Sequence, residues 1–365
     1  MSRPKYIPAL DGIRGIAVLA VVLFHYSYPF YSNSSTTNFF QIYLNDLLSF
    51  GGCGVFLFFV LSGFLITRIL LQAQIAPGYF KNFFIRRTFR IFPIYYATLA
   101  LFFLFLPLLN FRILPEITFA NQHFLWFYLT NLTSVPFGDL SHLWSLAVEE
   151  QFYLIWPFVV YFFSPKTVFR IILGYFTVFF ISRLVFSSYL THKIWYSLSC
   201  FQYIFFGCLL ALGQDKKSFF KYVNPKNLLL AFIVFVVSNG ANRALETVLT
   251  NLLNTLISGS FFAFLIAVCS VEKNAISNFF KSGWLQWLGK YSYAIYIFHL
   301  PVQRIGSLIF DRFNPLIAGL IPDGSLLEQV VWTSLCFTLS LTAAYISWHL
   351  LEKHCIGFAR KITSL

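Results

Sequence analysis

The chain is a series of apolar stretches, each about 20 residues long, separated by short polar connections. An α-helix needs about 20 mainly apolar residues to cross the hydrocarbon core of a bilayer. Ten stretches fit such spans, and 122–133 fits a half-span or a re-entrant segment. The ten lie near residues 10–31, 50–71, 91–109, 142–163, 170–190, 196–213, 227–241, 250–271, 286–310 and 329–351. The pattern predicts an all-α polytopic membrane protein in which one membrane domain fills residues 1–365.

Composition supports a membrane protein. The chain is 58% hydrophobic and 11% charged, with 48 phenylalanines and a mean hydropathy of +0.72. A soluble domain has no use for that much apolar surface, whereas lipid-facing helices do. The six cysteines are scattered singly through apolar stretches. They show no metal-binding spacing, so we expect neither a disulfide framework nor a bound metal.

The positive charge is distributed in a way that predicts topology. With the N-terminus inside, 18 of the 26 Lys and Arg residues fall on inner connections and only four on outer loops. This bias predicts that both termini are cytoplasmic, with the protein spanning a membrane such as the bacterial inner membrane. The net charge of +13 is therefore not the sign of a nucleic-acid partner. The first span is too long for a cleavable signal, and nine more follow.

Two ionisable residues, Arg14 and His25, lie inside the first span, and an acid, Asp11, precedes them. Eleven residues bring a helix back to within about 20° of its starting direction and about 16 Å further along its axis. Charged or titratable groups cost at least ~2.5 kcal/mol in hydrocarbon, so they usually face a cavity and serve a function. The alternative is an arginine that reaches the inner headgroups and a histidine that bonds within the bundle.

A basic segment, residues 81–93, follows the second span on the inner side. Arg87 and Arg90 are three residues apart, and Arg86 is adjacent. Guanidinium groups at this spacing can bind phosphates bidentately, as a nucleotide-bearing donor from the cytosol requires. From spacing alone, attraction to anionic lipid headgroups is equally consistent. The glycines of the preceding span, including Gly51, are interpreted as sites of close helix packing.

The fourth span carries two adjacent acids, Glu149 and Glu150. His142 and Ser145 precede Glu149 at spacings that put all three on one helical stripe. Two acids in an apolar span need a cation or a proton, and Arg14 and His25 are the obvious partners. One histidine with two acids makes a weak metal site. A structural ion pair between two spans remains an alternative.

The ninth span has a second polar stripe, formed by Ser292, Tyr296 and His299 at i, i+4 and i+7. Such a stripe either binds a polar ligand or forms hydrogen bonds between helices. Together with His142 and Ser145, these residues are the candidate substrate-binding groups.

These motifs occur in the order seen in the acyltransferase-3 family, which the chain resembles from about residue 6 to about residue 353. The matching features are the arginine and histidine of the first span, GVFLFFVLSGFLI, the RxxR segment, HLWSLAVEEQFYLIWP and SYAIYIFHLPV. The resemblance implies ten spans, acyl-CoA as a cytosolic donor, and transfer of the acyl group onto a hydroxyl, often of a carbohydrate. Some members carry an additional SGNH-type hydrolase domain. This sequence ends at residue 365 without one, so we do not expect a second transfer step in cis.

Residues and resemblance together favour O-acyl transfer, with acetyl as the expected group and no permanently bound cofactor. Arg86, Arg87 and Arg90 would bind the phosphates of acyl-CoA, and His25 would be the general base on the acceptor hydroxyl. Arg14 would stabilise negative charge, and Glu149 or Glu150 would hold the His25 tautomer or balance Arg14. The sequence leaves the acceptor open among surface polysaccharide, lipopolysaccharide, peptidoglycan and lipid-linked sugars.

Two other classes share parts of this pattern. A secondary transporter would also place Arg, His and Glu near the midplane, but the halves of this chain show no clear repeat. A non-catalytic polysaccharide flippase or assembly partner would not need to bind acyl-CoA. Transfer of a labelled acyl group separates both from an enzyme.

Overall fold

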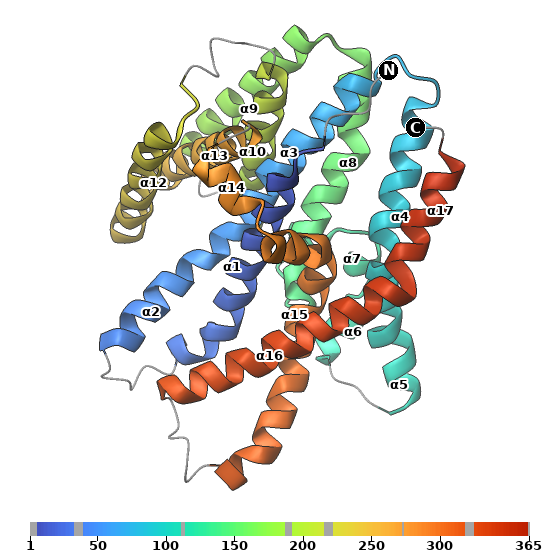
Figure 1. The fold of residues 1–365 in the computed structure, drawn as a ribbon, viewed down its shortest axis with the longest axis vertical. Helices are drawn as coiled ribbons and strands as arrows, with labels where there is room; N and C mark the ends of the chain where they lie inside the picture. The colour runs from blue at the N-terminus through green and yellow to red at the C-terminus, as the bar shows by residue number, and fades with distance from the viewer. Residues whose placement is uncertain are drawn as a thin grey trace.

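The computed structural model describes residues 6–32, 39–110, 114–186, 192–214, 222–271, 274–317 and 325–363, and these residues fold almost entirely into helices (Figure 1). The long helices are α1 (Pro8–Ser32), α2 (Phe39–Ser49), α3 (Cys53–Ala73), α4 (Tyr79–Ala100), α8 (Trp144–Phe162), α9 (Pro165–Val185), α10 (His192–Gly213), α12 (Pro225–Leu245), α13 (Val248–Ser270), α15 (Gly283–Ile317), α16 (Leu326–Ser347) and α17 (Lys353–Ile362). The short helices are α5 (Leu106–Leu108), α6 (Glu116–Ala120), α7 (His123–Trp126) and α14 (Ala275–Phe280).

Five short segments depart from α-helical geometry. Three are 3₁₀ turns: η1 (Phe50–Gly52), η3 (Thr130–Leu132) and η4 (Gly138–Leu143). Two are π-helical, η2 (Leu101–Phe105) and η5 (Trp348–Glu352), and η5 joins α16 directly to α17. The stretch 122–133, expected as a half-span, forms only the short α7 and η3.

Each of the ten expected spans corresponds to a long helix, which confirms the all-α polytopic fold class. Eight helical stretches of the described residues are long and apolar enough to cross a membrane; α8 and α15 are not among them. The number of crossings and the cytoplasmic termini therefore stay predictions. Part of the charge pattern behind that orientation lies outside the described residues, namely Arg3, Lys5, Arg112, Lys216, Lys217, Lys221 and Lys273.

The connection 31–48 is not simply a polar loop. Its second part forms α2, which continues through η1 into α3. Three large side chains of α2, those of Phe39, Phe40 and Tyr43, are exposed. They give α2 an apolar outer face.

Burial separates central helices from peripheral ones. Only 11% of the most apolar window of α12 is buried, against 67% for the stretch from α2 to α3. Figure 1 shows α12 at one margin of the bundle, and α4 with α17 at the other. Exposed leucine, isoleucine and phenylalanine cover α9 and α12, as lipid-facing helices require. The centre is α1, which packs against α15 and α3.

Glycine allows the central helices to touch at backbone distance. A Cβ on Gly289 of α15 would lie 1.9 Å from the Asp11 carbonyl oxygen of α1. In the same way, a Cβ on Gly63 of α3 would lie 1.9 Å from the Ile204 carbonyl oxygen of α10. Small residues at helix contacts are the usual means of close packing in membranes, where apolar burial gives little drive. The expected packing role of the second-span glycines is thus supported, and α1 is fixed against α15.

Candidate active site

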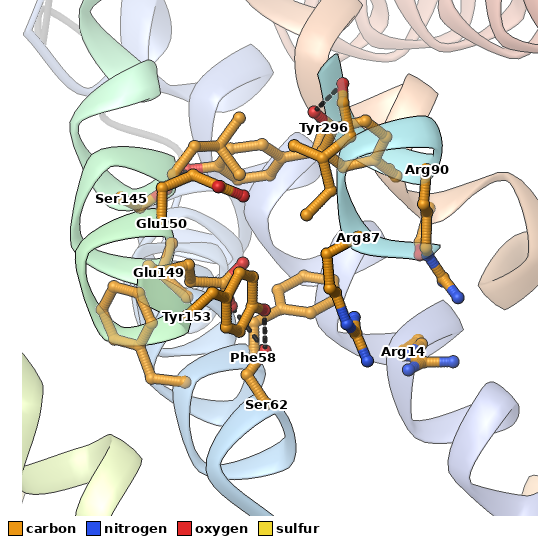
Figure 2. Close-up of a pocket in the computed structure, with 16 residues that line it drawn as sticks. Arg14, Phe58, Ser62, Arg87, Arg90, Ser145, Glu149, Glu150, Tyr153 and Tyr296 are labelled. Carbon is orange, nitrogen blue, oxygen red and sulfur yellow. Dashed lines mark hydrogen bonds between the residues drawn. The ribbon is translucent and has the colours of Figure 1, made fainter. Parts of the chain in front are cut away.

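A cavity of about 90 Å³ lies inside the bundle, where α1, α3, α4, α8 and α15 meet (Figure 2). Most of its polar lining comes from the residues that the sequence singled out. The lining residues are Arg14, Val55, Phe58, Phe59, Ser62, Arg87, Arg90, Ile91, Ser145, Leu146, Glu149, Glu150, Tyr153, Ser292, Tyr293 and Tyr296. Motifs far apart in the sequence therefore converge on one cavity.

Three arginines form one side of this cavity, which we call the arginine end: Arg14 from α1, and Arg87 and Arg90 from α4. Figure 2 shows their side chains across the cavity from Glu149 and Glu150. Arg14 Nη1 donates a hydrogen bond to Asp11 Oδ1 at 2.8 Å. Among the described residues, neither Arg87 nor Arg90 has a carboxylate oxygen within ion-pair distance. Donors remain available on this side for an anionic ligand.

Arg86 does not belong to the arginine end. Its Nε donates to Thr363 Oγ1 at 2.9 Å, just beyond the end of α17, and it is not among the cavity-lining residues. Consecutive helical residues point about 100° apart, so Arg86 and Arg87 cannot share a face. The basic segment therefore divides: Arg87 and Arg90 face the cavity, and Arg86 ties α4 to the C-terminal part of the chain.

The glutamates make contacts other than the expected ones. Ser62 Oγ donates to Glu149 Oε1 at 2.6 Å, and Tyr153 donates to Ser62 Oγ at 3.1 Å. Glu150 Oε1 is buried without a hydrogen-bond partner in the part of the chain that the structure describes. The ion pair of Arg14 is with Asp11. The suggested pairing of the glutamates with Arg14 or His25 is not among the recorded hydrogen bonds and ion pairs.

The two polar stripes meet at the end of the cavity that Ser145 and Tyr296 line. Ser145 Oγ and Tyr296 Oη are 2.6 Å apart, and Tyr296 Oη also donates to the His142 carbonyl oxygen at 3.0 Å. Ser292 lines the cavity one turn below Tyr296. His142 itself lies in η4, just before α8 begins at Trp144. The stripes therefore form hydrogen bonds between helices, and Ser145, Ser292 and Tyr296 also line the cavity. Binding of a polar ligand by these residues stays a prediction.

Beyond Tyr296, three histidines come together; we call His25, His142 and His299 the histidine cluster. The His25 and His299 ring centroids are 4.9 Å apart, and those of His142 and His299 are 4.6 Å apart. His299 Nε2 lies 3.3 Å from His25 Nδ1. Within the described ranges, no group of three His, Cys, Asp or Glu residues has an arrangement suited to a metal ion.

The tautomer of His25 follows from its contacts. His25 Nδ1 lies 2.8 Å from the Val21 carbonyl oxygen, one turn earlier in α1. A carbonyl oxygen can only accept a hydrogen bond, so the proton of neutral His25 is on Nδ1. Nε2 therefore carries the lone pair, and the His25 side chain is only partly buried. This is the state that a general base requires.

Some residues of the site escaped the sequence argument. Tyr153 follows Glu149 by four residues, so the i,i+4 rule could have found it. Ser62 lies beside Gly63 in the span whose small residues suggested only close helix packing, and nothing in the sequence shows that it faces Glu149. Asp11 was noted only as an acid at the start of the span. Its partner, Arg14, lies three residues further on, which is the spacing of a helical ion pair, so this pair could also have been predicted.

The bundle and its cavity define a polytopic membrane protein with an internal polar site. The profile of the acyltransferase-3 family (Acyl_transf_3), described as an acyltransferase domain, matches residues 7–349. The chain belongs to this family.

Curated relatives cover nearly all of the chain. It is 28% identical over 339 residues to peptidoglycan O-acetyltransferase OatA of Listeria monocytogenes, covering 86% of this chain and 52% of the relative. It is 28% identical over 385 residues to the putative peptidoglycan O-acetyltransferase YrhL of Bacillus subtilis, covering 96% and 55%. O-acetyltransferase OatA of Staphylococcus aureus is 25% identical, covering 93% and 57%. The chain thus spans about half the length of these relatives. No solved structure matches it.

Proposed function

We propose that the protein is a membrane O-acetyltransferase that moves an acetyl group from acetyl-CoA to a hydroxyl of a cell-envelope carbohydrate. The observation that carries this proposal is a polar cavity with the arginine end on one side and Tyr296 in its lining. The histidine cluster does not line this cavity, but it begins directly behind Tyr296, whose hydroxyl donates to the His142 carbonyl oxygen. The family and the relatives named O-acetyltransferases favour the reaction class. The peptidoglycan named for two of the relatives is the first acceptor to test.

The arginine end is suited to the phosphates of the donor. Arg14, Arg87 and Arg90 line one cavity, and guanidinium groups bind phosphate oxygens through paired hydrogen bonds. Among the described residues, Arg87 and Arg90 have no carboxylate within ion-pair distance, so a polyanionic ligand would lower the free energy of this region. A neutral donor would give these arginines no such role.

The histidine cluster is suited to the acyl-transfer step. In the proposed reaction, His25 Nε2 takes the proton of the acceptor hydroxyl while the hydroxyl oxygen attacks the thioester carbonyl carbon. The C–S bond then breaks, the CoA thiolate leaves, and the proton is passed to that sulfur. An acyl-histidine intermediate is the alternative, in which Nε2 itself attacks the thioester.

The two ends are separated by a defined length of helix. Arg14 and His25 are eleven residues apart on α1, or about 16 Å along the axis. Arg14 is therefore too far from His25 to stabilise charge on the reacting carbonyl, and we assign it to the donor phosphates. Ser62, Ser145 and Tyr296 line the same cavity as Arg14, and the arm of the donor would pass along this lining.

The experiment that tests the function uses purified protein in lipid vesicles with acetyl-labelled CoA and peptidoglycan fragments. A His25→Asn variant, checked for unchanged thermal unfolding, is the matched control. Label in the glycan with wild type and none with His25→Asn would support the proposal. Absence of transfer to any envelope glycan, together with absence of CoA binding, would reject it and favour a transporter.

A further inference from the structure

The ring of His25 is held through Nδ1, which leaves Nε2, the nitrogen proposed as the base, free of these contacts. Its Nδ1–H faces two acceptors, the Val21 carbonyl oxygen at 2.8 Å and His299 Nε2 at 3.3 Å. Val21 belongs to the same helix as His25, whereas His299 comes from α15, 274 residues later in the chain. Among the described residues, His299 Nε2 is the group of another helix that lies within hydrogen-bond distance of the His25 ring.

The tautomer of His299 is also determined by its surroundings. His299 is fully buried, and its Nδ1 lies 2.6 Å from the Tyr296 carbonyl oxygen. The proton of His299 is therefore on Nδ1, and its Nε2 presents a lone pair to His25. Donor and acceptor match: His25 offers an N–H where His299 offers a lone pair.

His142 completes the arrangement without touching the reactive ring. Its Nε2 lies 3.1 Å from the Ile297 carbonyl oxygen, so it too gives its one proton to the backbone. Its ring packs against His299 in a T-shaped contact at 4.6 Å. Each of the three rings therefore gives its N–H to a backbone carbonyl oxygen as a neutral imidazole, although His142 Nδ1 is buried without a partner among the described residues. The packing of His142 supports the orientation of His299.

We propose that His299 is the positioning residue of His25: it accepts the Nδ1–H hydrogen bond and stabilises the imidazolium that forms when Nε2 takes a proton. This inference rests on the proposed function, in which His25 is the base. His299 occupies the position that a carboxylate takes in many catalytic dyads. A neutral acceptor suits the interior of a membrane, because a buried carboxylate carries a large desolvation cost.

The same helix also holds the backbone of His25. Gln303 Nε2 donates to the His25 carbonyl oxygen at 3.2 Å, four residues after His299 on α15. His299 and Gln303 therefore lie one turn apart and contact the ring and the main chain of one residue. The bond from Gln303 reaches only the backbone of His25. The contact with His299 is therefore the one from α15 whose strength depends on the charge of the His25 ring.

The test compares two substitutions of His299. His299→Leu removes the acceptor, while His299→Gln keeps an oxygen near the position of Nε2. His349→Leu is the matched control, because exposed His349 is likewise bonded through Nδ1 to a carbonyl one turn earlier, that of Tyr345 at 2.9 Å. Each variant is prepared as the full chain in lipid vesicles, and its thermal unfolding is compared with wild type.

The first readout is carbethoxylation of His25 by diethylpyrocarbonate without substrate, followed by mass spectrometry. The unprotonated imidazole nitrogen attacks a carbonyl carbon of the reagent, so the rate of modification reports the nucleophilicity of Nε2. We expect His299→Leu to slow the modification of His25 on the order of tenfold, as loss of a hydrogen bond to a developing charge implies. His299→Gln should restore most of the rate, and His349→Leu should have no effect. A wild-type rate in His299→Leu, or an equally slow rate in His299→Gln, would overturn the proposal.

The second readout is steady-state transfer from acetyl-CoA. Loss of the acceptor should lower kcat about 10- to 100-fold while KM for acetyl-CoA stays unchanged, because the donor phosphates bind elsewhere. A rise in KM with kcat unchanged would contradict the role. If no variant, including wild type, transfers acetyl groups while carbethoxylation still depends on His299, the proposed function fails but the coupling of the two histidines stands.

The wild-type protein supplies a further check that needs no substitution. Nitrogen-15 NMR of histidine-labelled protein separates the two neutral tautomers by the shifts of the ring nitrogens. We expect His25 and His299 both to carry the proton on Nδ1. A His25 ring protonated on Nε2 would overturn the proposal even if His299→Leu does not fold.

Discussion

The two ends of the polar site are built on different principles. At the arginine end, three guanidinium groups line one cavity, and the ion pair recorded among the described residues joins Arg14 to Asp11. In the histidine cluster, every ring gives its one proton to a backbone carbonyl oxygen. The first arrangement leaves charge to be matched by a ligand, and the second leaves a lone pair on His25. In the proposed function, binding of the donor and movement of the proton are therefore separated along α1.

Substitution of His25 should have the largest effect. His25→Asn removes the lone pair on Nε2 and should lower kcat by a factor on the order of 10² to 10⁴, the usual contribution of a general base. Transfer of labelled acetyl groups in vesicles measures it. A folded His25→Asn protein with wild-type turnover would remove the histidine cluster from the chemistry.

Substitution of the arginines on α4 should weaken binding of the donor at the arginine end and leave the chemical step at the histidine cluster unchanged. Arg87→Gln and Arg90→Gln should each raise KM for acetyl-CoA about 10- to 100-fold, since a hydrogen bond to a charged group is lost. Turnover at saturating donor should change little. Initial rates over a range of acetyl-CoA concentrations test this. A fall in kcat at constant KM would place these arginines in the chemical step instead.

The packing of α1, which carries both Arg14 and His25, can be disturbed without replacing a residue of the arginine end or of the histidine cluster. Gly289→Ala would place a Cβ 1.9 Å from the Asp11 carbonyl oxygen, so α1 and α15 must separate. We expect a loss of about 1–3 kcal/mol of stability, the usual cost of overpacking. Thermal unfolding in detergent measures it, with Gly174→Ala in α9 as control because nothing lies within 4 Å of its Cβ. Equal unfolding temperatures would show that the contact is looser than described.

Substitution of Glu149 should have a smaller effect than substitution of His299. Its Oε1 accepts from Ser62, and Glu149→Gln keeps an oxygen for that bond. We therefore expect kcat to fall by less than about tenfold, the effect of losing no more than one neutral hydrogen bond. The same vesicle assay measures it. A complete loss of turnover would indicate that Glu149, rather than His299, orients His25, as the sequence suggested.

Arg86→Ala should change donor binding least of all. The Arg86 side chain bonds Thr363 rather than lining the cavity. We expect KM for acetyl-CoA to stay within about fivefold of wild type, as for loss of a surface contact. A change as large as that of Arg87→Gln would show that all three arginines bind the donor.

Much of the fold could be predicted because membrane helices leave a direct record in sequence. Apolar stretches of about 20 residues gave the long helices, and eleven-residue spacing put Arg14 and His25 on one face. Helical periodicity also brought Ser292 and Tyr296 together on the cavity side. These features depend on a single helix and its own geometry.

Contacts between helices could not be predicted in the same way. Periodicity fixes which residues share a face, but not which neighbour that face meets. The contact of His25 with His299 joins residues 274 positions apart, and the bond of Ser62 to Glu149 joins residues 87 apart. The sequence suggested that a glutamate holds the His25 tautomer or balances Arg14, whereas the structure places His299 beside His25 and Asp11 beside Arg14.

The separation of the two ends is tested most directly by CoA binding without chemistry. Titration calorimetry with unacetylated CoA compares wild type, His25→Asn and the double variant Arg87→Gln, Arg90→Gln in the same vesicles. The account predicts that His25→Asn binds CoA as wild type does, while the double variant binds at least about tenfold more weakly. Loss of binding in His25→Asn with retained binding in the double variant would contradict it.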